Sequence, residues 1–315
     1  MFGKKFFDKA IIIIIVIVIF YTGILIISDY EIISEKIYLI NYQFFPIIFS
    51  LIGIQMFFHS IKYHRLLQQA KIKLSFRESF MIYLAGLSMI ATPGTMGTAI
   101  KAHILKSKYK ISLSSNLPII YFEKWTEFLA ILIIVSVILF WSFMYESIIA
   151  IILGYCLVGI LIILSSRSKS FLYIAKFLQK IKYFRKFTAN LDESKSTFQI
   201  LNSKRNVFES VGWSILAKLS QILAVYLIFL SLEVQLELFL VGQIFYTSVI
   251  LGILSFLPGG IIVVEASMLG LLIKNGLEFS VATILVVLVR LITTWSVAVI
   301  GAITLKHVLK EKQKN

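Results

Sequence analysis

Several apolar runs, each about as long as a bilayer core is thick, constrain the fold of this chain more than any other feature. Residues 10–27 are mostly isoleucine, valine and leucine, and several later stretches are as long. A helix needs roughly 20 apolar residues to cross a hydrocarbon core about 30 Å thick. Only 15% of the 315 residues are charged, whereas an average soluble domain has roughly 25%. The sequence therefore excludes a soluble enzyme and, despite a net charge of +15, a DNA-binding protein. It predicts an all-α, polytopic membrane protein.

The first apolar run follows three lysines, as the apolar region of a signal peptide does. It is too long for such a region, and no small-residue cleavage site follows before the acidic stretch Asp29–Glu35. We therefore interpret it as a retained first span. The single cysteine, Cys156, excludes an intrachain disulfide and a cysteine metal site, and we expect no cofactor. The apolar runs lie at about 10–28, 37–58, 76–92, 117–143, 147–165, 208–230, 236–257, 261–274 and 279–305.

Basic residues gather in alternate connections between these runs. Of the 31 lysines and arginines, 25 fall in the segments 1–9, 59–75, 101–116, 166–207 and 306–315. Acidic residues such as Glu31, Glu233 and Glu278 fall in the other connections. Connections rich in lysine and arginine stay in the cytoplasm, so both termini are predicted to be cytoplasmic. The segment 166–207 indicates an amphipathic helix on anionic headgroups, with a plain basic loop as the alternative.

This charge pattern requires two regions to enter and leave the membrane on the same side. Region 76–105 begins and ends at basic segments, and region 236–274 begins and ends at acidic connections. Each has a break at its middle, Pro93-Gly94 and Pro258-Gly259-Gly260. Proline removes a backbone donor and glycine lets the chain turn, so we predict two re-entrant helical hairpins whose tips meet inside the membrane. Kinked helices that cross the membrane are the alternative.

The two hairpins lie in matching surroundings, because a span precedes and follows each of them. The first spans of the two units run in opposite directions, which is the plan of an inverted-topology repeat with a site near the membrane midplane. The sequence thus predicts one membrane domain over 1–315 with about six full spans and two hairpins. Its parts are the first span 10–28, repeat 1 at 37–143, a linking span at 147–165, the basic segment 166–207 and repeat 2 at 208–305.

Charged residues within the apolar runs mark the candidate site, because a charge near the bilayer centre costs about 2.5–3.5 kcal/mol on insertion scales. Lys101 and Glu265 lie on the returning arms of the hairpins, and Glu123 and Arg290 lie on the spans that follow. We expect these charges to pair around a polar midplane cavity, within each repeat unit or between the units. Thr293 and Thr294 follow Arg290 and are expected to orient its guanidinium group.

Three of the lysines in these runs have simpler interpretations. In the first of these interpretations, Lys101 ends its hairpin and its side chain extends to the cytoplasmic face. Lys124 is three residues from Glu127 on one helix and would pair with it. Glu123 and Glu127 share a helix face, which is unfavourable unless cations lie opposite, and Lys218 is a candidate partner for one of these acids.

The sequence shows no set of residues spaced for catalysis, and we expect that this protein is not an enzyme. It contains no glycine-rich phosphate loop followed by lysine and serine or threonine, and a lipid-modifying transferase is disfavoured because no nucleophile and base are placed together. Gly94, Gly97, Gly259 and Gly260 instead precede apolar segments whose helical N-termini favour an anion such as a lipid phosphate. The histidines lie in or beside basic segments and do not cluster with carboxylates at metal-ligand spacing; they are His59, His64, His103 and His307.

Over residues 10–305 the chain resembles the flippase-like transmembrane family, known from the membrane region of lysylphosphatidylglycerol synthases. Thr95 and Thr98 stand where that family often has a basic residue and a glutamate, and Ile262 stands where it often has glycine. The residues that carry the resemblance are Thr92-Pro93-Gly94 with Gly97 and Lys101, Glu123-Lys124 with Glu127, Leu257-Pro258-Gly259-Gly260 with Glu265, and Arg290 with Thr293 and Trp295.

The resemblance implies a translocase that moves a phospholipid, or a polyprenyl-phosphate-linked glycolipid, between leaflets of the plasma membrane. The alternative is a non-catalytic membrane subunit that scaffolds a lipid-modifying enzyme or glycosyltransferase. The chain stops about ten residues after the last span, so we expect no transferase domain. The expected partners are the bilayer, an anionic or glycosylated lipid and a separate modifying enzyme, but no nucleic acid. The residues expected to contact the substrate are Pro93, Gly94, Gly97, Lys101, Glu123, Glu127, Pro258, Gly259, Gly260, Glu265, Arg290 and Thr293.

Overall fold

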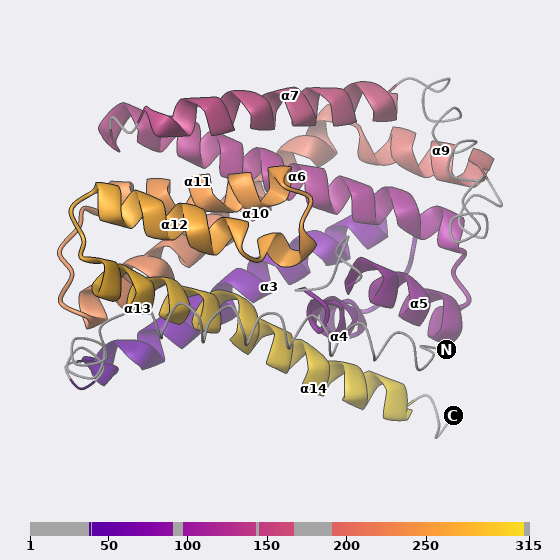
Figure 1. The fold of residues 1–315 in the computed structure, drawn as a ribbon. Coiled ribbons are helices and arrows are strands. Elements are labelled where there is room, and N and C mark those ends of the chain that lie inside the picture. Colours follow the sequence, from indigo (N-terminus) through magenta and orange to yellow (C-terminus); the bar gives the residue numbers. More distant parts are fainter. Residues whose placement is uncertain (1–37, 39, 91–96, 143–144, 167–190, 312–315) are drawn as a thin grey trace.

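The structure is a computed structural model that describes residues 38, 40–90, 97–142, 145–166 and 191–311. Every regular element in these residues is helical, as the sequence predicts, and Figure 1 shows the longer helices lying alongside one another. The elements are η1 (Tyr42–Phe44), α3 (Phe45–Gln69), α4 (Phe76–Leu87), α5 (Gly97–Tyr109), α6 (Leu113–Ser142), α7 (Glu146–Ser166), α9 (Leu191–Leu201), α10 (Lys204–Ser231), α11 (Leu238–Leu254), η3 (Pro258–Gly260), α12 (Val263–Lys274), α13 (Phe279–Arg290), η4 (Leu291–Trp295) and α14 (Ser296–Glu311).

Helices long and apolar enough to cross a bilayer are present where the sequence predicts spans. They are the segments Tyr42–Gln69, Pro118–Trp141, Lys204–Ser231 and Phe279–Lys310. The last of them is α13 and α14 joined without a break by the π-helical turn η4. The predicted linking span corresponds to α7, an apolar helix of 21 residues. The predicted first span, 10–28, and residues 167–190 of the basic segment lie outside the described residues.

The helix of the second predicted span extends beyond residue 58. Helix α3 continues to Gln69, so His59 and Lys62 belong to this helix. The side chain of Lys62 is fully buried. A lysine near the end of an apolar run normally marks a loop, but partners from other helices hold Lys62 inside the protein.

Each region predicted as a hairpin contains two short helices that contact each other. Helix α4 packs against α5, and α11 packs against α12. Figure 1 shows α12 lying beside α11, with the turn around η3 at one end of both. The residues that join α4 to α5, 91–96, lie outside the described part of the chain.

The two halves of the chain contact each other through matching elements. Helix α3 packs along α10, α4 packs against α14, and α11 packs against α6. Asn41 N–H donates to the carbonyl of Ser231 at 2.8 Å, and Lys62 Nζ to Ser214 Oγ at 3.1 Å. The residue number thus rises along α3 as it falls along α10, so the two helices are antiparallel. At the contact of α4 with α14, a Cβ atom added to Gly301 would lie 2.3 Å from the backbone nitrogen of Ser88.

Helix α4 begins with a capping box. Ser75 Oγ accepts a hydrogen bond from Glu78 N–H at 3.3 Å, and Glu78 Oε2 accepts one from Ser75 N–H at 2.9 Å. The Tyr109 hydroxyl donates to Glu78 Oε1 at 3.0 Å, which ties the end of α5 to the start of α4. The hydrogen bonds from Ser75 hold the pKa of the Glu78 carboxyl below its ordinary value.

Candidate functional site

Lys101 of α5 and Glu123 of α6 form a closed ion pair in the interior. Lys101 Nζ lies 2.7 Å from both carboxylate oxygens of Glu123, and the two residues are 4% and 0% exposed. The ammonium group also lies 4.6 Å and 5.0 Å from the ring centroids of Tyr63 and Tyr83, at cation–π distance. The predicted pair of Lys101 with Glu123 is confirmed. The interpretation that Lys101 reaches the cytoplasmic face is wrong, because the carboxylate and the two rings hold its charge inside.

Lys62 joins three helices at one ammonium group. Its Nζ donates to Glu127 Oε1 at 3.0 Å, to the carbonyl of Glu123 at 3.2 Å and to Ser214 Oγ of α10 at 3.1 Å. The Ser214 hydroxyl donates in turn to the carbonyl of Ser210, which leaves its oxygen to accept from Lys62. An ammonium group has three donors and no acceptor, so all of its hydrogen-bonding capacity is used.

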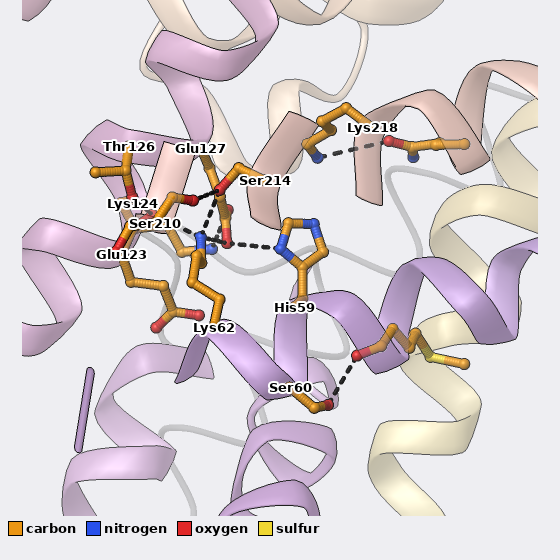
Figure 2. A network of polar contacts seen from close by, with 12 residues as sticks. His59, Ser60, Lys62, Glu123, Lys124, Thr126, Glu127, Ser210, Ser214 and Lys218 are labelled. Carbon is orange, nitrogen blue, oxygen red and sulfur yellow. Dashed lines mark hydrogen bonds and ion pairs between the residues drawn. The ribbon is translucent and has the colours of Figure 1, made fainter. Parts of the chain in front are cut away.

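Two further polar groups, from Lys124 and His59, contact Glu127, whereas Lys218 contacts a different residue (Figure 2). Lys124 Nζ lies 3.1 Å from Glu127 Oε2, and its side chain is 44% exposed. His59 Nδ1 lies 3.5 Å from Glu127 Oε1. Lys218 Nζ lies 3.5 Å from Gln221 Oε1, and no carboxylate oxygen of the described residues lies within 4.0 Å of it.

We call the group Lys62, Lys101, Lys124, Lys218, Glu123 and Glu127 the first cluster. It contains four ammonium groups and two carboxylates, so its formal charge is +2. Glu123 and Glu127 do share one face of α6, and cations do lie opposite both of them. The interpretation in which Lys218 pairs directly with one of these acids is wrong, because Lys101, Lys62 and Lys124 already occupy the carboxylate oxygens.

Arg290 and Glu265 form the second cluster. Arg290 Nε donates to Glu265 Oε1 at 2.7 Å, Nη1 donates to Thr294 Oγ1 at 3.1 Å, and Nη2 donates to the carbonyl of Gly259 at 3.2 Å. Arg290 is 6% exposed and Glu265 is 1% exposed. Glu265 lies in the first turn of α12, where the helix dipole favours an acidic group, and Arg290 lies just before η4 within the continuous helix Phe279–Lys310. The predicted pair is confirmed, and the cluster is formally neutral.

The backbone turn before α12 presents the Gly259 carbonyl to Arg290. Gly259, Gly260 and Ile262 have φ angles of 59°, 64° and 75°. Glycine adopts this left-handed region freely, whereas for a β-branched residue it is an outlier. Gly260 also has to be small, because a Cβ atom there would lie 3.1 Å from Gly252 Cα on α11.

The remaining predicted residues are placed as follows. Gly97 is the first residue of α5, and Pro258, Gly259 and Gly260 form η3. Thr293 Oγ1 donates to the carbonyl of Val289 at 2.7 Å, so Thr294 and not Thr293 orients the guanidinium group. Pro93 and Gly94 lie outside the described residues, and the predicted meeting of the two hairpin tips stays a prediction.

His59, Lys62 and Ser214 take part in the site, although the sequence does not predict their roles. His59 contacts Glu127, but this single contact is not a cluster at metal-ligand spacing. The sequence does contain an indication of the longer helix. Residues 59–70 include neither glycine nor proline, so no helix-breaking residue ends α3 there. Within the described ranges, no group of three or more His, Cys, Asp or Glu side chains is placed to hold a metal ion.

Comparison with known proteins agrees with this arrangement. The sequence pattern of the lysylphosphatidylglycerol synthase TM region matches residues 11–301, which include both clusters. A UPF0104 membrane protein of Methanothermobacter thermautotrophicus is 22% identical over 254 residues, which cover 73% of this chain and 75% of that protein. A UPF0104 membrane protein of Pyrococcus horikoshii is 26% identical over 273 residues, which cover 78% and 81%. The chain therefore belongs to the family of the lysylphosphatidylglycerol synthase transmembrane region, as a membrane protein with several candidate spans.

Proposed function

We propose that this protein moves a lipid that carries a phosphate group, either a phospholipid or a polyprenyl-phosphate-linked glycolipid, between the leaflets of the plasma membrane. The observation that carries the proposal is the burial of charged residues from both clusters among helices long and apolar enough to span a bilayer; they are Lys62, Lys101, Glu123, Glu265 and Arg290. Such charges are costly at membrane depth and are retained where they pair or line a polar path. A polar headgroup needs such a path, because the hydrocarbon core offers it no hydrogen bonds.

In this proposal α4–α5 and α11–α12 are re-entrant hairpins within an inverted repeat. Their helices have 12, 13, 17 and 12 residues, fewer than the roughly 20 that a full crossing needs. The reciprocal packing of α4 on α14 and of α11 on α6 supports the repeat, because each hairpin then contacts the last span of the other unit. Both termini and the basic segments face the cytoplasm.

The two clusters have different tasks in the proposed route. Three acceptors already engage the Arg290 guanidinium group, so the second cluster fixes the hairpin turn at Gly259. The first cluster provides charged groups beside the α4–α5 hairpin, and there Lys101, Glu123 and Glu127 guide the headgroup. No covalent step is involved.

A leaflet-resolved assay tests this function. The purified protein is reconstituted in liposomes with a fluorescently labelled phosphatidylglycerol, and a membrane-impermeant reductant quenches the outer leaflet. Exchange should exceed that of protein-free liposomes. The double variant Lys101→Met/Glu123→Gln removes both charges of one pair without leaving either unpaired, and it should slow exchange by at least about tenfold, or about 1.4 kcal/mol in the barrier.

The matched control is Lys106→Met, which changes an exposed lysine on the same helix α5 and should leave the rate unchanged. Folding of each variant is checked by its unfolding temperature in detergent. Exchange no faster than in protein-free liposomes, for phosphatidylglycerol and for a polyprenyl-phosphate glycolipid alike, would contradict translocation. Capture of a lipid-modifying enzyme by the same inactive preparation would then favour the scaffolding subunit.

A further inference from the structure

The first cluster has more positive charge than its own carboxylates balance. Both carboxylate oxygens of Glu123 accept hydrogen bonds from Lys101, and the two oxygens of Glu127 pair with Lys62 and Lys124, respectively. Lys218 has only the Gln221 amide oxygen, at 3.5 Å. Burying charge without a counter-charge is expensive, and anionic side chains of the described residues do not supply one here. An anion from outside the chain would balance the surplus.

The surplus charge lies where a ligand can reach it. Lys62, Lys101 and Glu123 are buried, but the Lys124 side chain is 44% exposed and Lys218 is half-buried. Lys62 contacts Ser214, and α10 runs antiparallel to α3. Lys218 therefore lies about one helical turn further along, level with residues 57–58 of α3. The accessible lysines thus belong to facing helices, α6 and α10, which pack against each other.

Buried polar atoms that make no hydrogen bond to the described residues lie along α3 on both sides of this level. They are Gln55 Oε1, His59 Nδ1 and Tyr63 OH, of which His59 Nδ1 has a longer contact of 3.5 Å with Glu127 Oε1. The three residues are 9%, 3% and 1% exposed. Their spacing of four residues places them on one face of the helix. A buried polar group without a partner costs about 1–3 kcal/mol, so three on one face indicate a polar ligand or water beside α3.

We propose that Lys124 of α6 and Lys218 of α10 bind a phosphate group, with His59 of α3 as a third hydrogen-bonding group beside them. This site rests on the proposed function and names the chemical group that the transported lipid presents. Lys62 does not take part directly, because its three donors are used within the protein.

The chemistry of the site favours a phosphate ester over a carboxylate or a halide ion. A phosphodiester has one negative charge and balances half of the surplus of two positive charges, whereas a fully ionised phosphomonoester has two and balances all of it. Its oxygens can accept from two ammonium groups at once. The unpartnered Gln55 amide oxygen accepts hydrogen bonds, which suits a hydroxyl on the glycerol or sugar attached to the phosphate.

Binding to the full-length purified protein in detergent tests the site. The probes are dioctanoyl phosphatidylglycerol as a lipid phosphate, glycerol phosphate as a free phosphate, and dioctanoylglycerol as the same lipid without phosphate. Calorimetry should show binding of the first probe and none of the third. Lys218→Met and Lys124→Met should each weaken binding by about tenfold or more, Lys218→Arg should retain it, and Lys106→Met should leave it unchanged.

Glycerol phosphate distinguishes a free phosphate ester from a lipid phosphate as the ligand. If glycerol phosphate displaces dioctanoyl phosphatidylglycerol at a similar concentration, the site binds free phosphate esters. If it does not, the site binds the lipid. Equal binding of dioctanoylglycerol, or unchanged binding by folded Lys218→Met, would overturn the site. The proposed function fails separately. Lysine-dependent binding without exchange in liposomes refutes transport but keeps the site, and exchange that Lys218→Met leaves unchanged refutes the site but keeps transport.

Discussion

The two buried charge clusters of this protein differ in how completely they are paired. In the second cluster, Arg290 is held by a carboxylate, a hydroxyl and a carbonyl, and its charge is balanced by Glu265. In the first cluster, four lysines share two carboxylates and Lys218 contacts only an amide oxygen. A closed and neutral pair stabilises one arrangement of the chain. An open cluster with surplus charge is better suited to exchange a ligand, because it is not satisfied without one.

The largest difference between the clusters should appear when a single charge is removed. Arg290→Met leaves Glu265 buried without its partner and should cost about 3–5 kcal/mol of unfolding free energy. Lys218→Met removes a cation that has no ion-pair partner among the described residues, so it should cost little or should stabilise. Denaturant unfolding in detergent measures both. Equal destabilisation by the two variants would break the comparison, and Arg290→Lys, which keeps the charge but loses the fork of donors, should fall between them.

A second test compares how the helices around the hairpins pack. Gly301→Ala places a methyl group 2.3 Å from the backbone nitrogen of Ser88, where α14 crosses the end of α4. Backbone atoms cannot turn away as a side chain can, so we expect a loss of about 1–3 kcal/mol.

The matched control is Gly270→Ala in α12, where a Cβ atom meets nothing within 4 Å. Alanine in a helix is more favourable than glycine by roughly 0.5–1 kcal/mol, so this variant should be slightly more stable than the parent. If both substitutions have the same sign, the close contact of α14 with α4 is not present in solution.

A substitution in the turn of the second hairpin should have a smaller effect on the free energy of unfolding, and it should stabilise the protein. Ile262 has a φ of 75°, and a β-branched residue in that region costs about 1–3 kcal/mol. Ile262 is 41% exposed, so Ile262→Gly loses little packing and should raise the unfolding free energy by about 1 kcal/mol. Its neighbour Ile261 is buried and Ile261→Gly should destabilise. A destabilising Ile262→Gly would contradict the left-handed backbone at this position.

The same two clusters show how far the sequence predicts the structure. The spans could be predicted from apolar length, and the pairs Lys101–Glu123 and Glu265–Arg290 from the cost of isolated charges. Ile262 has a φ of 75°, which is an outlier for a β-branched residue. This strain can be seen only in the structure.

The contacts of Lys62 could not be predicted in the same way. Its partners Glu127 and Ser214 are 65 and 152 residues away, and a lysine near the end of an apolar run normally marks a loop. Two of the lysines that were counted to predict the orientation in the membrane, Lys62 and Lys101, are therefore buried in the protein. Local patterns identify which residues are unusual, but only the packing of α3 on α6 and α10 shows which of them meet.

The smallest expected effect distinguishes the starts of the two hairpins. Helix α4 has the Ser75–Glu78 capping box, whereas Glu237 at the start of α11 makes no side-chain capping bond. Glu78→Gln should therefore cost about 0.5–1 kcal/mol at neutral pH, and Glu237→Gln should cost less.

The pKa of Glu78 is lowered in the folded state by its hydrogen bonds from Ser75. The unfolded state then binds more protons as the pH falls below the ordinary glutamate value of about 4.3. The Glu78 contribution is thus fully present above that pH and is lost as the pH falls through the lower folded value. Unfolding temperatures of the parent and Glu78→Gln should converge in acid, whereas a constant difference from neutral pH to acid would show that the carboxylate charge does not stabilise α4.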